Sequence, residues 1–188
     1  MRLAALLLLG VSARAGIVDR VAVAVGNKVI TQSEIELRIR LTAFQNQATP
    51  DFSTESRRLA AERLIDQRLV EKEMDVGRYP RLAAARALEL VGDYEKSDYN
   101  GDHLAFLAAL GKYDLTEDDV AGDLARQSDL LTFLSLRFRP SVQVSNGPDE
   151  KRLEESGDSE LDLWLRDQRK RIRIDYVDKG LAPEAAAK

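Results

Sequence analysis

The sequence predicts a mainly α fold of about six helices, with a small N-terminal β-hairpin that a C-terminal strand joins. Charged residues make up 32% of the chain and aromatic residues 6%, a balance typical of helix-rich proteins. Apolar residues recur at three- and four-residue intervals through most of the chain, whereas β-branched residues gather near both ends. The apolar content of 44% is enough for a core rather than for disorder.

Residues 1–15 have the features of a cleavable signal peptide. Arg2 supplies positive charge, residues 3–11 form an apolar run, and Ala13-Arg14-Ala15 has the small-x-small pattern that signal peptidase cuts. The run is shorter than the roughly 20 residues that span a bilayer, so we expect a signal peptide rather than a membrane anchor. From the small-x-small pattern we expect cleavage after Ala15. The alternative is a buried N-terminal helix.

The first predicted structure of the mature chain is a hairpin. Residues 17–25 are rich in β-branched residues and predict a strand. Gly26 and Asn27 tolerate positive φ, so with residues 28–30 they predict a tight turn and a returning strand.

A helix is predicted after Thr31, although its pattern is ambiguous. Thr31 and Glu34 have the spacing of a capping box. Residues 35–41 alternate apolar and polar residues, which favours a strand, while their Glu, Leu and Arg content favours a helix. We predict a helix that ends near Gln47.

Five further helices follow from caps, apolar stripes and stops. Ser53 or Thr54 caps the first of them and Thr116 the fourth, while Gly77, Gly111 and Pro140 mark ends. The fourth has the stripe Val120, Leu124, Leu131, Leu134 and Phe138. The predicted helices span residues 53–75, 82–94, 102–110, 116–139 and, from Asp158 or Ser159, the segment before a strand at 172–177.

The predicted domain is interrupted once. Residues 16–142 form its helical part, and residues 143–157 contain Asn-Gly-Pro and Ser-Gly with mixed charges, which predicts a linker. Residues 158–181 complete the domain with a helix and a strand, and residues 182–188 form a tail.

No catalytic, cofactor or metal site is predicted. The sole histidine, His103, has no nucleophile or orienting partner in its pattern, so we interpret it as an exposed helix-start residue. The absence of cysteine excludes disulfides, thiolate metal ligands and a cysteine-linked lipid anchor. A basic face is formed by Arg166, Arg169, Lys170, Arg171 and Arg173, which we interpret as a solvated helix surface; the alternative is a site for an anionic partner. The net charge of −4 argues against a nucleic-acid partner, and we expect no membrane insertion after signal cleavage.

Several stretches together resemble SurA-type periplasmic chaperones, and the resemblance covers nearly the whole mature chain. They are Ile-Val-Asp-Arg-Val-Ala-Val-Ala-Val-Gly-Asn-Lys-Val-Ile-Thr at 17–31 with Gln-Ser-Glu at 32–34, Arg-Leu-Ile-Asp-Gln-Arg-Leu-Val-Glu-Lys-Glu at 63–73, and residues 106–119, 136–140 and 161–181. The family's parvulin-type prolyl isomerase domains need about a hundred residues, whereas only residues 142–158 lie at that place. The resemblance therefore implies a chaperone module without isomerase activity.

The resemblance implies an ATP-independent periplasmic holdase of unfolded, above all outer-membrane, proteins that is not an enzyme and needs no cofactor. The alternative is a structural or assembly subunit of the cell envelope that binds one fixed partner. As polypeptide-contacting residues we predict large apolar groups near helix ends or off the main stripes: Phe44, Phe106, Leu110, Tyr113 and Phe133.

Overall fold

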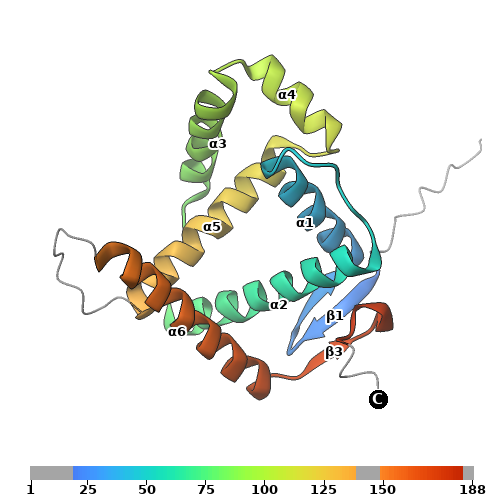
Figure 1. Ribbon diagram of the computed structural model, residues 1–188, viewed down its shortest axis with the longest axis vertical. Coiled ribbons are helices and arrows are strands. Elements are labelled where there is room, and N and C mark those ends of the chain that lie inside the picture. The colour runs from blue at the N-terminus through green and yellow to red at the C-terminus, as the bar shows by residue number, and fades with distance from the viewer. Residues whose placement is uncertain (1–18, 139–148, 184–188) are drawn as a thin grey trace, which may run out of the picture.

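A computed structural model describes residues 19–138 and 149–183, except the side chains of 149–159. The predicted signal peptide and residues 143–148 of the predicted linker lie outside these ranges. The described chain is mainly helical with a small antiparallel sheet, as predicted (Figure 1). The elements are β1 (Val21–Val25), β2 (Lys28–Thr31), α1 (Gln32–Gln45), α2 (Thr54–Gly77), α3 (Ala84–Tyr99), α4 (His103–Lys112), α5 (Glu117–Phe138), α6 (Asp149–Arg171), β3 (Ile174–Tyr176) and the short 3-10 helix η1 (Lys179–Leu181).

The sheet joins the two ends of the domain. Its strand order is β2-β1-β3, and β1 is antiparallel to both neighbours. Val25 pairs with Lys28 across the hairpin, and Gly26 adopts a φ of 60°, which glycine reaches without steric cost. The backbone N–H of Gly26 donates to the carbonyl of Arg173 at 2.9 Å, so the turn itself contacts the C-terminal segment.

Helix α1 begins at the predicted capping box. The Thr31 hydroxyl accepts from the Glu34 N–H at 3.3 Å, and the Glu34 carboxylate accepts from the Thr31 N–H at 2.9 Å. The apolar residues of α1 then face two cores. Ile35 and Ile39 are buried with the sheet and α2, whereas Leu41 and Phe44 are buried against α3, α4 and α5. A helix buried on two sides accounts for the alternating pattern in the sequence.

Replacing Thr31 by alanine should lower the free energy of unfolding by about 1 kcal/mol, because the first turn of α1 loses its side-chain cap. Urea denaturation followed by circular dichroism measures the change. Ser135→Ala, an exposed substitution inside α5, is the matched control and should change stability by less than about 0.5 kcal/mol. Equal effects of the two substitutions would show that the cap contributes nothing.

Three apolar clusters hold the helices together. The first joins the sheet to α1 and α2, the second joins α1 to α3, α4 and α5, and the third joins α2 to α5 and α6. In Figure 1, α3 and α4 lie at one end of the molecule and the sheet at the other, with α1, α2 and α5 between them. Ala61, Ile65 and Met74, which lie on one face of α2, are buried.

Several predicted boundaries are wrong. Helix α6 begins at Asp149, so residues 149–157 are helical rather than linker. Lys, Arg, Leu and Glu at 151–155 favour a helix, and their propensities outweigh the Ser-Gly pair that suggested a loop. Helix α3 continues to Tyr99 and α4 to Lys112, so Gly111 lies inside α4.

Two residues predicted from local pattern have other roles. Gly77 does not adopt the left-handed conformation that ends α2, since that residue is Arg78 with a φ of 52°. A Cβ at position 77 would overlap the ring of Tyr79, which explains the glycine by close packing. Leu131 is 66% exposed rather than part of the α5 stripe, because Phe133 takes the buried position against Trp164 and Tyr79.

Candidate functional site

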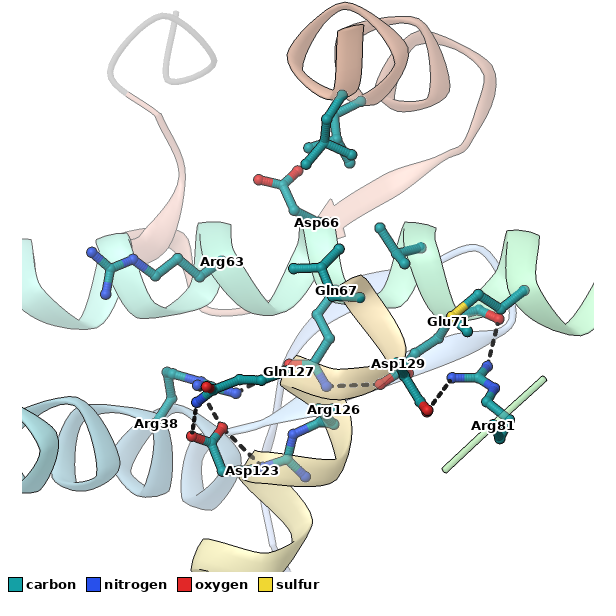
Figure 2. A pocket seen from close by; sticks show the side chains of 15 residues that line it. Arg38, Arg63, Asp66, Gln67, Glu71, Arg81, Asp123, Arg126, Gln127 and Asp129 are labelled. Carbon is teal, nitrogen blue, oxygen red and sulfur yellow. Dashed lines mark hydrogen bonds and ion pairs between the residues drawn. The ribbon is translucent and has the colours of Figure 1, made fainter. Parts of the chain in front are cut away.

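A cavity of about 280 Å³ lies where α1, α2, α5 and α6 meet (Figure 2). Its lining combines apolar side chains with carboxylates, guanidinium groups and amides. This mixture of an apolar surface and a few polar groups is typical of binding pockets. The apolar side chains are Val70 and Met74 of α2, Leu130 of α5, and Leu161 and Leu165 of α6.

Asp123 forms the polar wall between α1 and α5. Its side chain is 1% exposed and pairs with the Arg38 guanidinium at 2.8 Å. It also accepts hydrogen bonds from the amides of Gln45 and Gln127, both at 2.8 Å. Buried carboxylates are tolerated only when such partners replace water. The Asp123 carboxylate is therefore already satisfied by the protein and holds α5 against α1.

The same polar wall continues onto α2. Arg38 also donates to the Gln67 amide oxygen at 3.2 Å, and the Gln67 amide nitrogen donates to Glu71 at 2.7 Å. Arg68 pairs with Glu71 at 3.0 Å and with Glu34, the residue of the α1 capping box. A continuous chain of contacts thus links the start of α1 to α2 and α5.

A cluster of charged and polar side chains attaches α6 and β3 to α2. The Arg169 guanidinium pairs with Asp66 at 2.6 Å and with Glu62, and the Tyr176 hydroxyl donates to Glu62 at 2.7 Å. Burial raises the pKa of Asp66, and Arg169 partly offsets this rise. The pKa of Tyr176 is also raised, mainly by burial and secondly by its hydrogen bond to Glu62. This cluster holds the helix that carries Leu161 and Leu165 beside the cavity.

Arg81 closes the cavity near the end of α2. Its guanidinium pairs with Asp129 of α5 at 3.2 Å and with Asp75 of α2 at 2.8 Å. The backbone N–H of Leu82 donates to Asp129 at 2.7 Å. The loop between α2 and α3 is thereby fixed to α5.

The residues predicted to contact polypeptides do not form a surface. Phe44, Phe106 and Leu110 are buried in the second cluster, Tyr113 is half-buried beside Phe44, and Phe133 is buried in the third cluster. A position near a helix end therefore does not expose these side chains. Those of the second apolar cluster pack between α1, α3, α4 and α5, whereas Phe133 packs against α2 and α6. In this structure they belong to the core, and their contact with polypeptides stays a prediction.

His103 is exposed at the start of α4, and its Nδ1 lies 2.9 Å from a carboxylate oxygen of Glu95. This hydrogen bond raises the pKa of His103 above 6.5. The pair therefore stabilises the fold fully below pH 6.5, and its contribution is lost as pH rises through the raised pKa.

NMR titration of the His103 ring should give a pKa above 6.5 in the wild type and a lower pKa in Glu95→Gln, which removes the charged acceptor. Asp98→Asn is a control that changes a nearby carboxylate on α3 without removing this contact. An unchanged pKa in Glu95→Gln would contradict the pairing.

Within residues 19–138 and 149–183, no group of three or more His, Asp or Glu side chains is placed to hold a metal ion. None of the helices in these ranges combines the length and apolar character needed to cross a membrane. No protein-family model matches the chain, and no curated protein matches it.

Proposed function

We propose that this chain is an ATP-independent periplasmic chaperone that holds unfolded polypeptides, outer-membrane proteins among them, without prolyl isomerase activity. The observation that carries the proposal is the cavity, which has an apolar lining from three helices. The resemblance to SurA-type chaperones supports it. In that family the C-terminal segment folds back onto the N-terminal domain, and here α6 and β3 likewise return to the N-terminal hairpin.

The apolar lining suits weak contacts with changing partners. Leu130, Leu161 and Leu165 are half-buried, so each keeps apolar surface that a client side chain can cover. Burial of such surface contributes about 25 cal/mol per Å², which gives modest affinity for a single side chain. A holdase needs such exchangeable contacts and no nucleotide.

The test is suppression of aggregation. The purified chain, in molar excess, is mixed with several unrelated denatured proteins, including outer-membrane β-barrels, and light scattering follows their dilution from denaturant. Reduced scattering for most clients is expected. Leu130→Gln, which changes the cavity lining, should weaken this effect, whereas the neighbouring exposed substitution Leu131→Gln should not.

The alternative, an assembly subunit with one fixed partner, predicts the opposite result. Every unfolded client would then aggregate despite excess protein, while one folded envelope protein would bind. A peptide assay for proline isomerisation should stay at background, and clear catalysis there would contradict the proposed absence of isomerase activity.

A further inference from the structure

Every carboxylate that lines the cavity already has a guanidinium partner. The shortest nitrogen–oxygen distances of these pairs lie between 2.6 and 3.2 Å. A carboxylate paired in this way is poorly placed to attract a further cation. The pairs are Asp66 with Arg169, Glu71 with Arg68, Asp123 with Arg38, and Asp129 with Arg81.

Two guanidinium groups at the cavity are not matched in this way. Arg63 makes no hydrogen bond or ion pair with any residue in the described part of the chain. Among the described residues, Arg126 reaches only Asp123, at 3.5 Å, and Asp123 is already paired with Arg38 at 2.8 Å. The Nε of Arg126 is buried and has no hydrogen-bond partner in the part of the chain that the structure describes. The four arginines and four carboxylates of the lining balance in charge, but Arg63 and Arg126 keep guanidinium N–H donors that no lining carboxylate takes up as its main partner.

The unmatched donors lie beside an apolar surface. Arg63 extends from α2 and Arg126 lies on α5 (Figure 2). Leu161 and Leu165 of α6 line the same cavity. The volume of about 280 Å³ is close to the lower end of the range for small-molecule pockets, so it suits a short segment of chain. A ligand that matches both features has an apolar group next to an anion.

We infer that the cavity takes client segments in which a large apolar side chain lies beside an aspartate or glutamate. The apolar group contacts Leu130, Leu161 and Leu165, and the carboxylate accepts hydrogen bonds from Arg63 or Arg126. A basic neighbour would place like charges together, so the site discriminates against lysine- and arginine-flanked segments. The inference rests on the proposed holdase function and names the segments that it selects.

The experiment uses three fluorescein-labelled ten-residue peptides and the purified full chain. The first peptide has one phenylalanine between two glutamates, the second has lysines in place of the glutamates, and the third has alanine in place of phenylalanine. Fluorescence anisotropy at low ionic strength gives each Kd. We expect the first peptide to bind about tenfold more tightly than either other peptide, and we expect high salt to reduce its advantage over the lysine peptide.

Variants locate the effect. Arg63→Gln removes an exposed guanidinium and should reduce the preference for the glutamate peptide to about threefold or less, and Arg126→Gln should act in the same direction. Lys72→Gln is the matched control, because it removes one exposed positive charge from α2 outside the cavity lining. Circular dichroism verifies that each variant is folded. If Arg126→Gln does not fold, Arg63→Gln alone tests the inference.

Equal binding of the glutamate and lysine peptides, an Arg63→Gln variant that behaves like Lys72→Gln, or no peptide binding at millimolar concentration would each overturn the inference. These outcomes are separate from the aggregation assay. If the wild-type chain suppresses aggregation but shows no charge preference, the holdase proposal stands and the segment preference is wrong. If it does not suppress aggregation, the holdase proposal itself fails.

Discussion

Asp123→Ala should lower the free energy of unfolding by about 3–5 kcal/mol, the range measured when one partner of a buried ion pair is removed. The side chain is 1% exposed, so alanine leaves Arg38 and the amides of Gln45 and Gln127 without their shared acceptor. Domains of this kind are stable by only about 5–15 kcal/mol. Urea denaturation followed by circular dichroism should show a large fall in the midpoint.

The matched control is Asp93→Ala on α3. Its carboxylate is 59% exposed and pairs with Lys96 at 3.7 Å, so its removal should cost less than about 1 kcal/mol. If the two alanine variants were equally stable, the Asp123 cluster would not hold α5 against α1. In Asp123→Asn, which keeps the shape but removes the charge, we expect a loss of stability between those of the two alanine variants.

Arg169→Met should cost about 2 kcal/mol at pH 7 and loosen the C-terminal segment. The substitution leaves Glu62 and Asp66 near each other and partly buried without their shared cation. The cost is smaller than for Asp123, because roughly a quarter to a third of each of these side chains is exposed and solvent screens the charges. Limited proteolysis should cut the variant near β3 faster than the wild type.

The loss in Arg169→Met should depend on pH. The pKa of Asp66 is raised above 3.8 by burial, and Arg169 lowers it, so removing Arg169 raises it further. The Asp66 carboxyl group then holds its proton more tightly in the folded variant than in the unfolded chain. The free energy of unfolding of the variant therefore falls as pH rises through this raised pKa. The deficit should therefore be full at pH 7 and shrink as pH falls towards 3.8. Arg171→Met, whose guanidinium is exposed, should lose little stability at either pH.

The sequence predicted most of the helices because the signals that start a helix are local. The capping box at Thr31 and Glu34 acts within one turn, so it identified α1 correctly despite the alternating pattern. That pattern was ambiguous because Ile35 and Leu41 enter different cores, which depends on where α2 and α5 lie. The start of α6 was not predicted because Ser156-Gly157 is typical of a loop, whereas here the helix propensity of the residues around this pair prevails.

The candidate site could not be predicted in the same way. An aromatic residue such as Phe106 has the same sequence pattern in a second core as on an exposed groove, and only the packing of α3, α4 and α5 decides between them. Arg169 belonged to a basic face interpreted as solvated, yet it pairs with two carboxylates on α2. Conversely, Arg63 has no partner among the described residues, and this depends on contacts between helices that local sequence spacing does not determine.

The strand order β2-β1-β3 has a consequence for the time course of folding. The central strand β1 is made first, but its partner β3 lies near the other end of the described chain. Closing so long a loop slows folding, and the unpaired edge of β1 is open to other strands during translation. In pulsed hydrogen exchange during refolding, the amides of β3 should gain protection after those of the β1–β2 hairpin. A protein proposed to shield unfinished chains thus passes through a stage in which its own sheet is unfinished.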